Sequence, residues 1–144
     1  MALTKVTGSG LGLITGDIAT STAGTSNLRA GVNAGDSITA GGNYNTVVGD
    51  GAGTAITTGD NNTFMGYAAG DAVTTANDNT GVGFQALTST TTGYSNVSMG
   101  VNAMNGNTTG HSNTGVGFQA LANNTEGTSN TGLGYNAGVN ITTG

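Results

Sequence analysis

The chain has 144 residues, no cysteine and a formal net charge of −5, with Lys5 and Arg29 as its two basic residues. So few basic residues exclude binding to nucleic acid through phosphate contacts and to anionic membranes through a polybasic patch. The lack of cysteine excludes disulfide bonds and thiolate metal sites. With 28 glycines and only 6% charged residues, the composition differs from that of an ordinary globular domain.

Residues 1–26 lack a complete repeat, and we predict an N-terminal cap or attachment segment there. Residues 22–26 look like the second half of a unit. The apolar stretch around Leu11, Leu13 and Ile14 is too short for a membrane span or for the apolar region of a secretory signal. If Met1 is native, we therefore expect assembly in the cytoplasm rather than secretion.

From residue 27 onward, a unit of 17 residues repeats, and we predict that residues 27–144 form one β-solenoid domain. Each unit opens with an Asn, counted here as position zero, and Gly, Ala and Thr recur at positions four, seven and twelve. The first interval has 18 residues, which places one extra residue near Tyr44. A period this regular indicates stacked structural units and argues against a flexible linker. The opening residues are Asn27, Asn45, Asn62, Asn79, Asn96, Asn113 and Asn130.

Positions one to five of each unit alternate between two faces, which predicts a β-strand. In the unit opened by Asn113, Thr114, Val116 and Phe118 fall on one face, whereas the glycines between them fall on the other. We expect position three, which is Val, Met or Leu in six units, to fill the core. The segment around the Thr at position twelve is expected to form a short bridge or a turn, with Gly at the tight corner.

Seventeen residues suit one coil of a parallel β-solenoid, or β-roll, with two short strands and two turns. The sequence therefore predicts an all-β rod of about seven coils, stacked about 4.8 Å apart. Asn at position zero and Thr at position twelve are expected to hydrogen-bond to their counterparts in neighbouring coils. The handedness of the coil is left open.

The apolar residues exceed what so thin a core can hold, because position seven is always Ala. Position eight is Leu or Met in three units, Leu87, Met104 and Leu121. We expect one apolar set to pack against other copies of the chain around a symmetry axis. Position five is apolar or aromatic in six units: Val32, Tyr67, Phe84, Val101, Phe118 and Tyr135.

No catalytic, cofactor-binding or metal-binding residue is predicted, and receptor-binding residues are left unassigned. Asp60 and Asp78 lie near turns of adjacent coils, where a shared cation is the alternative to plain solvated turn residues. His111 occupies a variable turn position without an identifiable catalytic partner. It is either a surface residue or, in a trimer, one of three copies near the axis. Residues 49–53 are rich in glycine but lack the Lys of a phosphate-binding loop.

Residues 110–125, GHSNTGVGFQALANNT, resemble the N-T-A-x-G-x-x-A-L repeats of phage tail fibres and related surface proteins. They are also similar to the shorter head repeats of trimeric autotransporter adhesins, which fold as a left-handed parallel β-roll trimer. The opening residues 1–7, MALTKVT, resemble the start of many phage tail-fibre and tailspike chains. The sequence shows no counterpart of the signal peptide, stalk and membrane anchor of the autotransporters.

The resemblance implies a homotrimeric structural protein of a virion tail fibre, with no enzymatic activity and no cofactor. Such a rod spaces or presents a tip that binds a host receptor. The expected partners are further copies of the chain, other virion or fibre proteins and a host surface receptor, but neither nucleic acid nor an inserted membrane. The main alternative is the head of a bacterial adhesin at the cell surface.

Two further functions stay open at the sequence level. Paired Thr columns, as at Thr57 and Thr58, suit an ice-binding solenoid, although Ala40 and Glu126 interrupt the second column. Tyr44 and Tyr94 at turns are candidates for contacts with carbohydrate.

Overall fold

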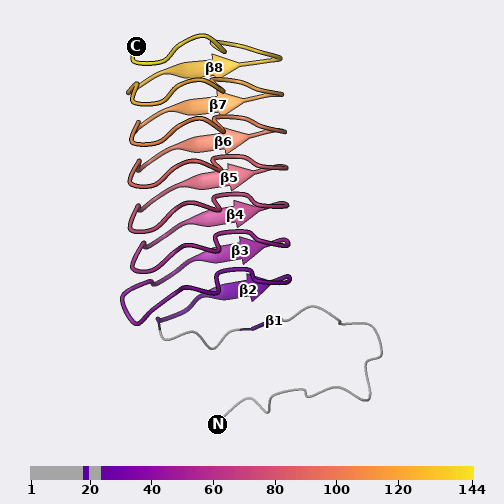
Figure 1. The fold of residues 1–144 in the computed structure, drawn as a ribbon, viewed down its shortest axis with the longest axis vertical. Helices are drawn as coiled ribbons and strands as arrows, with labels where there is room; N and C mark the ends of the chain where they lie inside the picture. Colours follow the sequence, from indigo (N-terminus) through magenta and orange to yellow (C-terminus); the bar gives the residue numbers. More distant parts are fainter. Residues whose placement is uncertain (1–17, 20–23) are drawn as a thin grey trace.

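The computed structural model describes residues 18–19 and 24–144, so most of the predicted cap or attachment segment lies outside the described residues. The described chain forms an all-β parallel solenoid, which confirms the predicted fold class (Figure 1). Seven three-residue strands pair in parallel in chain order, and a shorter strand, β1 (Ile18–Ala19), pairs antiparallel with the first of them. The seven are β2 (Leu28–Ala30), β3 (Thr46–Val48), β4 (Thr63–Met65), β5 (Thr80–Val82), β6 (Val97–Met99), β7 (Thr114–Val116) and β8 (Thr131–Leu133).

The pairing register follows the sequence repeat. Thr46 pairs with Thr63, 17 residues on, whereas Leu28 pairs with Thr46, so the first coil is longer by one residue. The extra residue is residue 40 or 41, slightly before the predicted site near Tyr44. Thr39 still bonds to Thr57, 18 residues on, so the extra residue follows Thr39. The side-chain amide of Asn27 bonds to the carbonyl of Gly42, 15 residues on, where Asn45 bonds 14 residues on, so the extra residue precedes Gly42.

Each strand ends after three residues because a Gly at position four turns the chain. Gly49 has a φ of 133°, and a Cβ added there would lie 2.4 Å from the carbonyl oxygen of Gly66 in the next coil. Only Gly tolerates both the backbone angle and this close approach. The segment around position twelve stacks through backbone bonds, such as Thr57 N to Thr74 O at 2.9 Å. It forms a turn and not the second strand that the two-strand coil requires.

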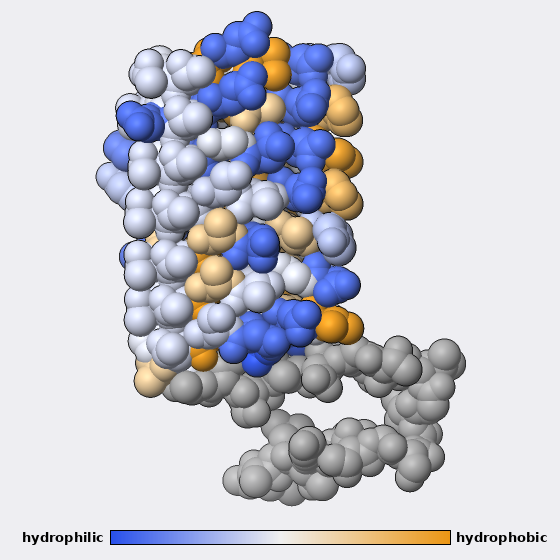
Figure 2. All heavy atoms as spheres, viewed as in Figure 1, coloured by the Kyte–Doolittle hydropathy of each residue, from blue (hydrophilic) through white to orange (hydrophobic). Residues whose placement is uncertain are grey.

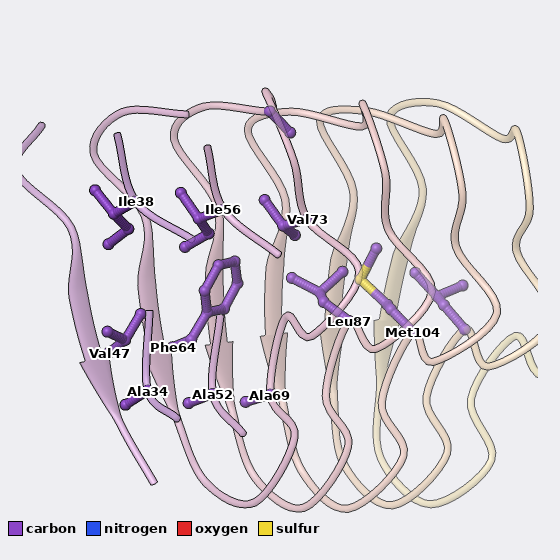
Figure 3. Packing of buried hydrophobic residues seen from close by; sticks show 12 residues of the cluster. Ala34, Ile38, Val47, Ala52, Ile56, Phe64, Ala69, Val73, Leu87 and Met104 are labelled. Atoms are coloured by element: carbon purple, nitrogen blue, oxygen red, sulfur yellow. The ribbon is translucent and has the colours of Figure 1, made fainter. Parts of the chain in front are cut away.

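The core is filled from positions two, eight and eleven, which corrects the expectation that position three fills it (Figure 3). Val47 and Phe64 at position two are fully buried, whereas Met65 and Met99 at position three are 46% and 42% exposed. The predicted alternation is correct, but the face that carries position three points outward. The inner face is the one on which Gly often replaces a side chain, because a neighbouring position fills the space.

Two kinds of core layer make up the second to the sixth coil, whereas the first and the last coil match neither kind, with Arg29, Gly35 and Ile38, and with Gly132, Gly138 and Ile141. In the first kind, position two is bulky, position eight is Gly and position eleven is aliphatic; in the second, position two is Gly or Ser, position eight is Leu or Met and position eleven is polar. Within one coil, a Cβ on Gly70 would lie 2.6 Å from the Phe64 ring. A Cβ on Gly115 would lie 2.8 Å from Cγ of Met104, which belongs to the preceding coil. A bulky side chain at position two or eight thus fills space left by a Gly of its own coil or of the next one. The first kind comprises Val47, Gly53 and Ile56, and Phe64, Gly70 and Val73; the second comprises Gly81, Leu87 and Thr90, Ser98, Met104 and Asn107, and Gly115, Leu121 and Asn124.

The second kind of layer places a large side chain on a left-handed backbone. Leu87, Met104 and Leu121 have φ angles of 55°, 48° and 51°. This conformation costs roughly 1–2 kcal/mol for a residue with a Cβ. All three side chains are fully buried, and full burial of such a side chain contributes about 1.5–3 kcal/mol. Burial therefore offsets the backbone strain.

The opening Asn residues form a buried ladder along the rod, as predicted. Asn79 Oδ1 accepts a hydrogen bond from the backbone N–H of Asn96 at 3.1 Å. Asn79 Nδ2 donates to the carbonyl oxygen of Gly93, in the last corner of the same coil, at 2.8 Å. The same pair of contacts recurs at Asn45, Asn62 and Asn96. Each Asn thus closes its own coil and joins it to the next.

Thr at position twelve forms a second ladder, as predicted, although its hydroxyl bonds to the backbone of the next coil. Thr57 Oγ1 donates to the carbonyl oxygen of Thr74 at 3.1 Å, and Thr74 Oγ1 donates to that of Thr91 at 3.2 Å. The carbonyl of Thr91 also accepts the backbone N–H of Thr74. The side-chain bond therefore supplements a backbone bond instead of replacing it.

Replacing Thr74 with Val, which keeps the branched shape and removes the donor, is expected to lower the free energy of unfolding by about 0.5–1 kcal/mol. Urea unfolding followed by circular dichroism measures this. The exposed neighbour Thr75 is the control, and its change to Val should have almost no effect. A loss above about 2 kcal/mol for Thr74→Val would contradict a supplementary role.

Candidate functional site

The candidate site is an outer apolar face made by positions three and five of successive coils. Figure 2 shows hydrophobic residues along one edge of the rod, the right-hand edge, toward which the strands point in Figure 1. At position five, Phe84 is 46% exposed and Tyr135 is 75% exposed. The outer apolar face comprises Val48, Met65, Val82, Met99, Val116 and Leu133 at position three, and Val32, Tyr67, Phe84, Val101, Phe118 and Tyr135 at position five.

Aromatic residues on this face stack along the rod. The Tyr67 and Phe84 ring centroids are 5.3 Å apart at an interplanar angle of 14°, and those of Phe118 and Tyr135 are 5.2 Å apart at 8°. Such stacks hold their rings in fixed orientations, because each ring is seated on its neighbour one coil away. The face is therefore a preformed surface.

Sequence analysis left open which apolar set lies outside, and the structure answers this. Leu87, Met104 and Leu121 at position eight are fully buried, so only positions three and five remain for contact with another molecule. The sequence does contain a signal for this. In the second to the sixth coil, position eight is Gly where position two is bulky, and position two is Gly or Ser where position eight is bulky, as expected of two positions that share the core. Of the two apolar sets that so thin a core cannot both hold, position eight is therefore inside and position five is outside.

The outer apolar face is large for a protein surface. From the sizes of its side chains and their exposed fractions, it presents on the order of 900 Å². Surface patches on monomers rarely exceed a few hundred Å², whereas each partner of a standard protein interface buries about 800 Å². The face thus has the size of one half of a stable interface.

The carboxylates of Asp60 and Asp78 both accept hydrogen bonds from Asn residues one coil earlier. Asp60 Oδ1 accepts hydrogen bonds from the backbone N–H of Asn43 at 2.7 Å and from its side-chain Nδ2 at 3.1 Å. Asp78 Oδ1 accepts one from Asn61 Nδ2 at 3.2 Å. Each carboxylate therefore accepts hydrogen bonds from the coil that precedes it in the chain. Across the described ranges, His, Asp and Glu side chains nowhere gather in groups of three that could hold a metal ion.

His111 lies at a corner of the rod, stacked on the ring of Tyr94 one coil earlier. Their centroids are 4.6 Å apart and their planes differ by 8°. The stack turns the face of each ring toward the other, so neither ring offers both faces to a ligand. Tyr44 is 59% exposed and lies at the same corner, at the place that Asn61 occupies in the next coil. This corner is separate from the outer apolar face.

The paired Thr columns differ in how free their hydroxyl groups are. Thr58, Thr75 and Thr109 at position thirteen are exposed. Position twelve donates its hydroxyl to the next coil, as at Thr108 to Thr125 O at 3.0 Å. Only one column therefore offers hydroxyl groups that are not already committed within the chain.

The described residues contain no helix that could span a bilayer. No protein-family model, curated protein or solved structure matches the chain. The outer apolar face and the resemblance of the repeat are therefore the two features that bear on function.

Proposed function

We propose that the chain is a structural fibre protein that assembles as a homotrimer through its outer apolar face, as the shaft or head of a phage tail fibre. The single observation that supports this is the size of that face, which water disfavours and a further copy of the chain can cover. A partner must carry an apolar surface of matching length with the same spacing between coils, and another copy of this chain has both.

The architecture suits a mechanical role. The Asn and Thr ladders and the parallel strands tie every coil to the next, so the rod resists bending. No enzyme and no cofactor chemistry is part of the proposal. The rod spaces, or itself presents, the surface that meets a host receptor, alongside other fibre proteins of the virion. In the alternative, a bacterial adhesin head, residues 27–144 themselves bind the host; robust binding of this fragment to cells or glycans would favour it.

Light scattering tests the association directly. The wild-type chain is expected to have three times its 13.9 kDa mass at micromolar concentration. A Phe84→Ser change removes an apolar side chain that is 46% exposed on the outer apolar face. It should weaken association by tenfold or more, because assembly buries the exposed half of this side chain, worth about 0.7–1.5 kcal/mol in each of three copies.

The matched control is Tyr94→Ser, at an aromatic residue that is 47% exposed at the corner instead. It should leave the oligomer intact, and both variants should keep the wild-type circular dichroism spectrum. A folded wild-type monomer, or equal weakening by both variants, would refute assembly through this face.

A further inference from the structure

A self-associating face with a regular repeat has an ambiguous register. If one copy slides by one coil along another, apolar side chains still meet apolar side chains, and only one layer of contact is lost at each end. An assembly of such chains needs a feature that distinguishes the correct level from its neighbours. Such a feature belongs in the layer of the outer apolar face that differs most from the others.

That layer is the second coil, where position five is Asp50. Figure 2 shows the hydrophobic edge broken by a hydrophilic stretch near its N-terminal end. Asp50 is exposed, between Val32 and Tyr67, which are each 53% exposed. Within the described part of the chain, the ion pair found is Arg29 with Asp36, and no basic side chain pairs with Asp50.

The same layer leaves space beside the carboxylate. Position six of this coil is Gly51, whereas the other coils carry Asn, Ala or Gln there. A Cβ added to Gly51 would meet nothing closer than 3.8 Å, and Ala68 adopts a similar backbone at the same position of the next coil. Packing within the chain therefore does not require this Gly. Its absence of a side chain opens a notch in which water can reach Asp50.

We infer that Asp50 sets the register in which copies of this chain associate through the outer apolar face. The inference rests on the proposed assembly and adds a specificity-determining residue to it. When parallel copies are aligned, the notches coincide. The carboxylates then repel one another, but water in the shared notches hydrates them and screens the repulsion. When a copy slips by one coil, its Asp50 meets Val32 or Tyr67 of a neighbour, and an unpaired carboxylate is buried against apolar groups.

Disulfide trapping tests this, because the chain has no cysteine of its own. Single-cysteine variants Phe84→Cys, Val101→Cys and Phe118→Cys, each in a form with and without a size tag, are mixed in pairs, assembled and oxidised. Aligned parallel copies should give cross-links between equal positions only. In the Asp50→Val background, links between positions 84 and 101 should rise about tenfold, since slipped copies no longer bury a charge.

Asp50→Glu keeps the charge and is the matched control, with the wild-type pattern expected. Equal patterns for wild type and Asp50→Val in an intact oligomer would overturn the role of Asp50 but leave the assembly standing. Links between positions 84 and 118 in wild type would show antiparallel packing if links between two copies of position 101 accompany them, and a slip of two coils if they do not. Either result would also overturn the role of Asp50. A monomer by light scattering, with no links, would refute both proposals.

Discussion

Replacing Gly70 with Leu is expected to lower the free energy of unfolding by about 3–4 kcal/mol, because the new side chain collides with the Phe64 ring. A Cβ alone would lie 2.6 Å from that ring. Phe64→Gly, which leaves a cavity in the same layer, should cost about 4 kcal/mol. The double variant recreates the arrangement of Gly81 and Leu87 in the next coil. It should therefore recover about 3 kcal/mol relative to the sum of the single changes.

Urea unfolding of the four chains completes this double-mutant cycle. The control for backbone strain is Gly51→Ala, which has a comparable φ of 68° but an open site beside it. It should cost about 1–2 kcal/mol, which is the backbone strain alone. If the two core changes were simply additive, exchange of volume between positions two and eight would not explain the two kinds of layer.

Replacing Asn79 with Ala is expected to cost about 3 kcal/mol of stability, because two buried backbone groups lose their partners. Asn79 is fully buried, and it bonds both the N–H of Asn96 and the carbonyl oxygen of Gly93. Asn79→Asp keeps the acceptor but cannot donate to Gly93, and it buries a charge. At neutral pH it should be less stable than the Ala variant.

The exposed Asn123 provides the control for this pair, and its change to Ala should alter stability by less than about 0.5 kcal/mol. Thermal and urea unfolding, each at one fixed protein concentration, measure all three variants. An Asn79→Ala chain as stable as the Asn123→Ala chain would show that the Asn ladder is dispensable.

Much of the fold follows from the sequence because the repeat constrains it. A strict period fixes the parallel register, and the invariant Asn and Thr predict the two ladders that hold the coils together. Alternation within each unit predicts the strand and the opposite placement of Thr114 and Gly115. These features depend on one position at a time, so a single sequence with seven copies is enough to find them.

The direction of the two strand faces does not follow in this way. Position three is Val, Met or Leu in six units and varies less than position two, so the sequence predicts that position three fills the core. The core instead uses Phe64 with Gly70 in one coil and Gly81 with Leu87 in the next, and neither column alone is uniform. In the second to the sixth coil, a bulky residue stands either at position two or at position eight, so only the two positions taken together show the core. Burial of Leu87 on a left-handed backbone also runs against its local preference.

The site was half predicted for the same reason. The surplus of apolar residues indicated an exposed set, and position five is part of it. Position three also belongs to the exposed set, because that face of the strand points outward. Position eight does not belong to it, because its side chains are buried. The trimer stays a prediction, which light scattering tests. A place in a virion and binding to a host receptor also stay predictions.

The hydrogen bonds between coils, such as Thr46 N to Asn62 O, run along the length of the rod. Tension applied to the two ends of one chain therefore acts on each layer in series, and the weakest terminal layer opens first. Each coil from the second onward releases 17 residues when it opens, or about 55 Å of extended chain; the first releases 18. A single chain under load would thus lengthen in equal steps and absorb energy at each one, as an extensible tether does.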